Sequence, residues 1–185
     1  MEKRMLPQLL ILVLLLLLMP GFTQDNLKVY RNDFPAFEIS IPNNLNNWKI
    51  RETTNLSRPI EFAIVTGEEL PQVNTYIELY GLKSPEIQQI WSDADKLFQS
   101  KTSYAKTYEK SVLPDIEFIS DKRISLAGLP AFDRVCRSQE LGRTYHIVYV
   151  LFPEGLVEFS FKSSTDSFKR YDEEFIAILN TLKKL

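Results

Sequence analysis

Residues 144–161 read TYHIVYVLFPEGLVEFSF, and their pattern places the strongest constraint on the fold. From residue 145 to residue 152, apolar side chains stand at both odd and even positions. Successive side chains of a strand point to opposite faces of a sheet, so a strand that is apolar at both parities needs cover on both faces. Residues 153–155, PEG, favour a turn, after which an extended segment resumes. We therefore predict a hairpin in the middle of a sheet whose two faces are both covered.

Other extended segments surround this hairpin in the sequence. Phe37, Ile39 and Ile41 alternate with polar residues, which is typical of a half-buried strand. Pro42 ends that run, and the asparagine-rich residues 43–47 favour a turn before an extended segment resumes at Trp48. Further extended runs are predicted at residues 60–66 and 75–82, and these two runs are expected to form a hairpin. Two more are predicted within residues 116–132, one on either side of Gly128. Residues 139–142 favour a turn in which Gly142 is left-handed.

Two segments have the periodicity of amphipathic helices. Residues 85–98 place their apolar side chains on one stripe, after a candidate N-cap at Ser84. Residues 166–185 do the same, and Lys183 and Lys184 near their end suit the negative end of a helix dipole. Two such helices and an antiparallel sheet predict an α+β fold. We expect a central antiparallel β-sheet with helices packed on both faces, an α/β/α sandwich.

Several short motifs follow one another along the chain: FEISIP at 37–42, Trp48, ISLAGLPAF at 124–132, the hairpin at 144–161 and FIAILNTLKKL at 175–185. In these motifs and their order the chain resembles the PsbP-like domain. That fold is shared by the extrinsic subunit of photosystem II, the Ran-binding Mog proteins and many exported bacterial proteins. The resemblance implies a central antiparallel sheet with helices on both sides and a non-enzymatic role in docking on other proteins. No metal-binding or cluster-docking positions of the photosystem subunit can be matched here, and the N-terminus argues against nuclear import, so the resemblance is to the exported bacterial-type branch.

The N-terminal residues 1–23 contain the parts of an export signal in order. Two basic residues precede an unbroken apolar run at residues 9–19, and small or turn-forming residues follow. The run is shorter than the roughly 20 apolar residues of a transmembrane helix. We therefore predict cleavage after Gly21 or Thr23, export to the periplasm or the medium, and no stable membrane span after cleavage; an uncleaved interfacial anchor is the alternative. Residues 24–185 are then expected to form a single PsbP-like domain.

Charge and composition argue against several classes of ligand. The chain has 22 Lys and Arg against 24 Asp and Glu, a formal net charge of −2. This balance gives no electrostatic reason to expect nucleic acid or an anionic membrane as a partner. One cysteine and one histidine cannot form a recognisable zinc cluster, and we expect the acidic residues of SDAD (92–95) and YDEE (171–174) to lie on solvated helix faces. We predict no metal site and no cofactor site.

The remaining candidates for chemistry are Cys136 and His146. A hairpin loop of residues 140–142 would pair Gln139 with Arg143. That register places Cys136 directly across from His146, as a nucleophile lies beside its base. A buried, packed pair is nevertheless the preferred interpretation, because the sequence supplies neither an orienting group nor oxyanion donors for the pair.

These observations lead to a functional hypothesis with no catalytic residue. We expect an exported, non-enzymatic binding or accessory protein of PsbP-like fold that docks on an envelope or extracellular protein partner. The alternative hypothesis is a small hydrolase or a small-molecule carrier that uses a pocket between the sheet and a helix, near Cys136 and His146.

Overall fold

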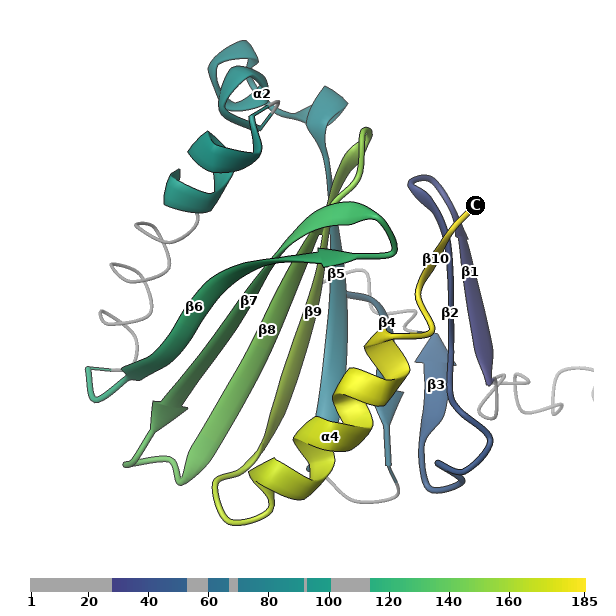
Figure 1. The fold of residues 1–185 in the computed structure, drawn as a ribbon, viewed down its shortest axis with the longest axis vertical. Helices are drawn as coiled ribbons and strands as arrows, with labels where there is room; N and C mark the ends of the chain where they lie inside the picture. Colours follow the sequence, from purple (N-terminus) through teal and green to yellow (C-terminus); the bar gives the residue numbers. More distant parts are fainter. Residues whose placement is uncertain (1–27, 53–59, 67–69, 92, 101–113) are drawn as a thin grey trace, which may run out of the picture.

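The computed structural model describes residues 28–52, 60–66, 70–91, 93–100 and 114–185. Within these ranges the chain forms two antiparallel sheets and a few helices, an α+β fold (Figure 1). The export segment predicted at residues 1–23 lies outside the described ranges.

The large sheet contains seven strands in the described ranges, in the spatial order β3-β4-β5-β9-β8-β7-β6. Every neighbouring pair is antiparallel. Its strands are β3 (Lys49–Glu52), β4 (Ile60–Val65), β5 (Gln72–Leu79), β6 (Glu117–Leu126), β7 (Leu129–Ser138), β8 (Arg143–Leu151) and β9 (Gly155–Ser164). The predicted hairpins, β4 with β5 and β8 with β9, are confirmed.

Strand β8 is buried at both parities, as its sequence predicts. Residues 146–150 are all buried. Val148 and Val150 belong to the main hydrophobic cluster, whereas Ile147 and Tyr149 belong to a second cluster. Because alternate residues of a strand point to opposite faces, the two clusters lie on the two faces of the sheet.

The predicted turns around β7 are also confirmed. Gly128, between β6 and β7, has φ +74°, and Gly142, between β7 and β8, has φ +59°. Both values lie in the left-handed region, which glycine adopts without steric cost because it has no Cβ.

A small sheet contains β1 (Val29–Asp33), β2 (Ala36–Ser40) and β10 (Lys183–Lys184), in the order β1-β2-β10. The predicted strand around Ile39 is therefore present, and the turn that follows Pro42 is closed by hydrogen bonds from Leu45 N to Pro42 O and from Trp48 N to Leu45 O. This turn does not join two paired strands, because it carries the chain from the small sheet to the large one. Strands β1 and β10 were not predicted from the sequence.

The first predicted helix is interrupted in the structure. It consists of α2 (Pro85–Trp91), preceded by the 3-10 turn η1 (Tyr80–Leu82), and a separate helical stretch at residues 94–100. Asp93 starts the second stretch, since its Oδ1 accepts hydrogen bonds from the backbone N–H groups of Asp95 and Lys96. An aspartate N-cap of this kind satisfies donors that a continuous helix would have used internally.

The C-terminal helix is α4 (Phe168–Leu179), and it is shorter than predicted. Its buried stripe packs against the large sheet and contacts β9 and β2 (Figure 1). Lys183 and Lys184 do not lie at a helix end, because they pair with Glu38 and Phe37 of β2 as strand β10. The prediction that these two lysines interact with the negative end of a helix dipole is therefore wrong.

Two clusters form the hydrophobic core. The main cluster joins side chains of β2, the large sheet and α4, among them Phe37, Phe159 and Phe175. The second cluster is built around Leu97, which is buried with Phe132 and Tyr149.

Candidate functional site

His146 lies in β8, on the face of the large sheet that packs against α4. It is buried, and each of its two ring nitrogens faces a carboxylate. Nδ1 is 2.5 Å from Oδ1 of Asp172 in α4, and Nε2 is 3.3 Å from Oδ2 of Asp133 in β7. Phe175 of α4 packs edge-on against the ring, with centroids 5.2 Å apart. The imidazole is therefore enclosed by groups from the neighbouring strand β7 and from α4.

A lysine at the sheet edge extends this charged cluster. Nζ of Lys122 in β6 lies 3.6 Å from Oδ2 of Asp133. Strand register explains why Asp133 is near His146. His146 of β8 is directly opposite Val135 of β7, and Asp133 is two residues before Val135. Asp133 therefore lies diagonally across from His146, on the same face of the sheet. Cations and carboxylates thus alternate from β6 to α4.

The cluster determines the protonation of His146. Burial alone lowers the pKa of His146, but the carboxylates of Asp133 and Asp172 outweigh burial and raise it to about 9. Burial raises the pKa of Asp133, yet the contact with His146 and the ammonium group of Lys122 outweigh it, so the pKa of Asp133 lies below its ordinary value. At neutral pH His146 is therefore an imidazolium between carboxylates.

This arrangement does not suit His146 to act as a general base. A general base needs an unprotonated nitrogen that faces its substrate, whereas both nitrogens of this imidazolium point at carboxylates. The two carboxylates also lie at opposite edges of the ring and do not converge on one point. The described residues contain no group of three or more His, Cys, Asp or Glu side chains that could hold a metal ion.

Cys136 does not face His146, contrary to the register considered from the sequence. The last pair of the β7–β8 hairpin is Ser138 with Arg143, so the turn contains residues 139–142, and Cys136 is opposite Tyr145. A shift of one residue moves a side chain to the other face of a sheet. The thiol of Cys136 is buried on the face opposite the imidazole, and the two groups cannot act as nucleophile and base.

The acidic residues of YDEE are not all solvated, which corrects a second expectation. Asp172 contacts His146, and Oε2 of Glu174 accepts a hydrogen bond of 2.5 Å from Nε1 of Trp48. The sequence contained a usable indication, because Asp172 falls within the apolar stripe of α4, four residues after Phe168. Of the SDAD residues, Asp95 is exposed as expected and pairs with Arg123.

The arrangement of strands and helices identifies the fold. A seven-stranded antiparallel sheet in the described ranges, a small second sheet and a C-terminal helix form a PsbP-like α+β fold, which confirms the resemblance noted in the sequence. In the part of the chain that the structure describes, no helix combines the length and apolarity that a membrane span requires.

Particular structures share this fold. The solution structure of cyanobacterial PsbP (CyanoP) from Synechocystis sp. PCC 6803 is similar with a TM-score of 0.60 at 13% sequence identity, over 90% of this chain and 96% of that one. The crystal structure of LpqN, involved in cell envelope biogenesis of Mycobacterium tuberculosis, is similar with a TM-score of 0.53 at 13% identity, over 80% and 82% of the two chains. No family model matches the chain, and no curated protein matches its sequence. At this identity the likeness concerns the fold alone.

Proposed function

We propose that this chain is an exported, non-enzymatic binding or accessory protein that docks on a protein partner in the cell envelope or outside the cell. The observation that carries the proposal is the state of His146. The single histidine of the sequence is charged, buried and bound by two carboxylates, and the single thiol lies on the other face of the sheet. The groups best suited to nucleophilic and acid–base chemistry therefore have structural positions.

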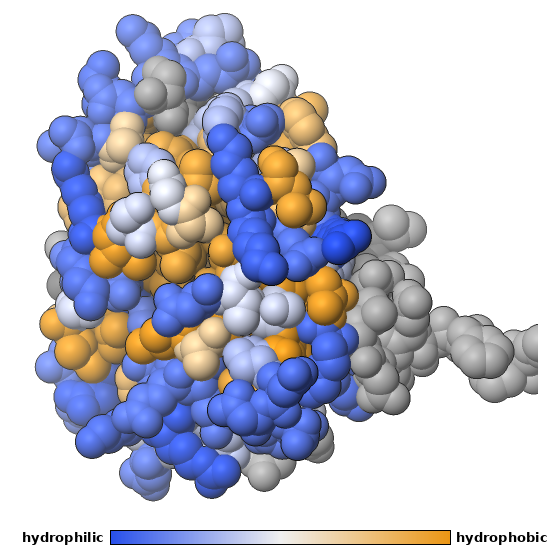
Figure 2. Space-filling view, turned by 45° about the vertical axis from the view of Figure 1, so that its right-hand side comes forward, coloured by the Kyte–Doolittle hydropathy of each residue, from blue (hydrophilic) through white to orange (hydrophobic). Residues whose placement is uncertain are grey.

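Three further observations support a docking role. Residues 1–23 have the pattern of an export signal. The fold is similar to that of LpqN, which is involved in cell envelope biogenesis. Large apolar side chains also remain exposed, among them Phe34 at 60% and Leu185 at 61%. On the face seen in Figure 2, hydrophobic residues appear across the middle between hydrophilic ones, a composition that suits a protein-binding surface.

The proposal includes the complete α/β/α layering. One layer is α4, and the second is the helical part of residues 85–100 on the opposite face. Its support is the second cluster, in which Leu97 is buried and the ring of Phe98 lies 4.9 Å from that of Phe132. A sheet covered in this way presents its edges, loops and helix surfaces to a partner.

The hydrolase alternative near Cys136 and His146 requires the thiol and the imidazole to face one space, and the observed register places them on opposite faces. We therefore do not propose it. The carrier alternative requires an apolar cavity between the sheet and a helix, and no observation above favours it.

Site-specific photocrosslinking of the full chain in its native cells tests the docking role. With p-benzoylphenylalanine in place of Phe34 or of Leu82, two exposed positions, we expect a discrete adduct with one extracytoplasmic protein. That protein, once purified, should bind the purified chain saturably, and the N-terminus of the exported chain should begin after residue 21 or 23. A chain retained in the cytosol would contradict the proposal. The proposal would also be contradicted if no reproducible adduct formed and the purified chain hydrolysed esters or thioesters.

A further inference from the structure

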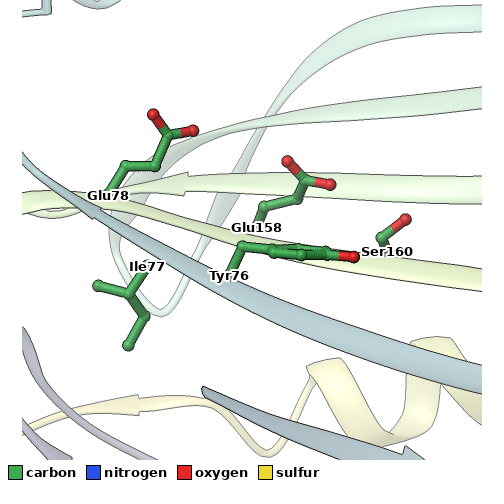
Figure 3. Close-up of a pocket in the computed structure, with 5 residues that line it drawn as sticks. All are labelled: Tyr76, Ile77, Glu78, Glu158 and Ser160. Carbon is green, nitrogen blue, oxygen red and sulfur yellow. The ribbon is translucent and has the colours of Figure 1, made fainter. Parts of the chain in front are cut away.

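A small pocket lies on the large sheet, where β5 and β9 pair. Its volume is about 230 Å³, and Figure 3 shows the residues that line it: Tyr76, Ile77 and Glu78 from β5, and Glu158 and Ser160 from β9. None of these residues takes part in the His146 cluster.

Strand register explains why the polar side chains gather on one face. Tyr76 is directly opposite Glu158 in the ladder, and Glu78 and Ser160 are each two positions further along their own strands. These four side chains therefore point to the same side of the sheet. Ile77 points to the other side, where it packs against the main hydrophobic cluster. In Figure 3 the ring of Tyr76 lies beside Glu158, with its hydroxyl directed toward Ser160.

The chain itself places an ammonium group at this pocket. Nζ of Lys83 lies 3.0 Å from Oε2 of Glu78, and the two side chains are 30% and 33% exposed. Lys83 follows η1, so a short loop brings this lysine back to the strand that carries Glu78. The contact shows that a primary amine can reach a pocket carboxylate at ion-pair distance.

The lining selects for positive charge and small size. Two carboxylates repel anions and accept charge-assisted hydrogen bonds, and the face of a tyrosine ring attracts cations. Ser160 adds a hydroxyl oxygen that can accept a hydrogen bond from an N–H group. A volume of about 230 Å³ is below the roughly 300–1,000 Å³ of sites for drug-sized ligands, so it suits the end of one side chain and not a nucleotide or a large cofactor.

We propose that this pocket binds an ammonium or guanidinium group, presented as a lysine or arginine side chain by the protein partner. The inference rests on the proposed docking role and identifies the chemistry that the partner brings to this face. Lys83 pairs with Glu78 in the unbound chain. The incoming cation competes with the chain's own contacts for the carboxylates of Glu78 and Glu158 and lies beside the ring of Tyr76.

Amide chemical-shift titrations of the exported chain test this pocket without the partner. The probes are Nα-acetyl-lysine methylamide and Nα-acetyl-arginine methylamide, and the neutral isostere Nα-acetyl-norleucine methylamide is the control. We expect saturable shifts at Tyr76, Glu158 and Ser160 with the two cationic probes alone. Glu158→Gln should weaken binding about tenfold, because it removes one charged contact.

Two further variants test whether the affinity for the cationic probes depends on the charges at this pocket. Lys83→Met should strengthen binding of the lysine probe several-fold, because it removes the competing ammonium group at Glu78. Glu173→Gln, an exposed position on α4, should leave binding unchanged. Equal binding of the norleucine probe, or equal losses in Glu158→Gln and Glu173→Gln, would overturn the inference. So would tighter binding of a neutral saccharide such as methyl glucoside.

The pocket and the docking role can fail separately. If photocrosslinking identifies a partner whose affinity is the same for the wild-type chain and for Glu158→Gln, and the cationic probes do not bind, the docking role stands and the pocket inference is wrong. If the probes bind as expected but no partner is captured, the pocket chemistry stands and the docking role loses its support.

Discussion

The attraction of two carboxylates for His146 exceeds the cost of burying its charge. A pKa raised from 6.5 to about 9 corresponds to about 3 kcal/mol of net stabilisation of the charged form. His146→Gln removes the cation that faces both Asp133 and Asp172 and leaves both carboxylates without their charged partner. We expect it to lower the free energy of unfolding by about 3 kcal/mol at pH 6, since breaking a buried ion pair typically costs about 3–5 kcal/mol.

Urea denaturation measures this loss, and a surface ion pair provides the control. Arg123 and Asp95 form a pair whose side chains are 49% and 66% exposed. Asp95→Asn should therefore change the free energy of unfolding by less than about 1 kcal/mol. Similar losses in the two variants would show that the buried cluster contributes no more than an exposed pair.

The same cluster predicts a definite dependence on pH. The folded-state pKa of His146 is raised, so its stabilisation is complete below its ordinary value of 6.5 and is lost as pH rises through about 9. The folded-state pKa of Asp133 is lowered, so its contribution is present above its ordinary value of 3.8 and is lost as pH falls further. The difference in unfolding free energy between wild type and His146→Gln should be largest between about pH 4 and pH 6.5. A constant difference from pH 5 to pH 10 in urea titrations would contradict this.

Some of this cluster could be predicted from the sequence and some could not. Asp172 interrupts the apolar stripe of a helix, and Asp133 has the parity of buried residues in β7, so both positions indicate buried charge. The β7 residue that lies opposite His146 changes if the turn between β7 and β8 is one residue longer or shorter. Local sequence permits either register, and only the packing of whole strands selects one.

At the scale of elements, the β5–β9 pair depends on a residue without a side chain. A Cβ added to Gly155 would lie 2.6 Å from the backbone oxygen of Glu78 and 3.1 Å from Cα of Leu79. Both are backbone atoms of the paired strand, so they cannot move aside without disturbing the ladder. Gly155→Ala should destabilise the protein by about 1–3 kcal/mol, as overpacking does. Gly81→Ala is the matched control for thermal and urea unfolding, since no atom lies within 4 Å of its added Cβ and we expect a change within about 0.5 kcal/mol.

The junction between α4 and the small sheet depends on one hydroxyl. Oγ1 of Thr181 accepts a hydrogen bond of 2.8 Å from Ser40 N and lies 2.7 Å from Ser40 O. Thr181→Val keeps the shape and leaves the Ser40 N–H without its acceptor. It should therefore cost about 1–3 kcal/mol and accelerate hydrogen exchange at the Ser40 amide. Thr181→Ser keeps the hydroxyl and should retain the protection of that amide. Equal exchange rates in the valine and serine variants would rule out this role.

Elements that depend on local periodicity were predictable, and those that depend on distant pairing were not. The apolar stripe of α4 and the alternation of apolar and polar residues in β2 can be recognised from residues that are close together in the sequence. Strand β10 consists of two lysines, and only its pairing with β2, at the other end of the chain, makes it a strand. The break before residue 94 had a local cause, the capping side chain of Asp93, which the apolar stripe alone does not reveal.

At the scale of the whole molecule, the two sheets share one core. Ile39 of the small sheet, Val148 and Phe161 of the large sheet and Ile178 of α4 belong to the same buried cluster. The charged contacts cross the same boundaries, because His146 is bound by a residue of β7 and by one of α4. Neither sheet could expose its inner face without exposing part of the other.

A shared core predicts cooperative unfolding of the described residues. Trp48 is buried, contacts Tyr171 edge-on and donates to Glu174, so its fluorescence reports on the junction of the turn after β2 with α4. In a Trp91→Phe background Trp48 is the sole tryptophan, and its urea transition should coincide with that of far-UV circular dichroism, which reports mainly on the large sheet. His146→Gln should move both midpoints together without changing the slope, because it weakens a contact shared by the whole structure. Two separated transitions would mean that the small sheet and α4 unfold independently of the large sheet, and that residues 24–185 are not one domain.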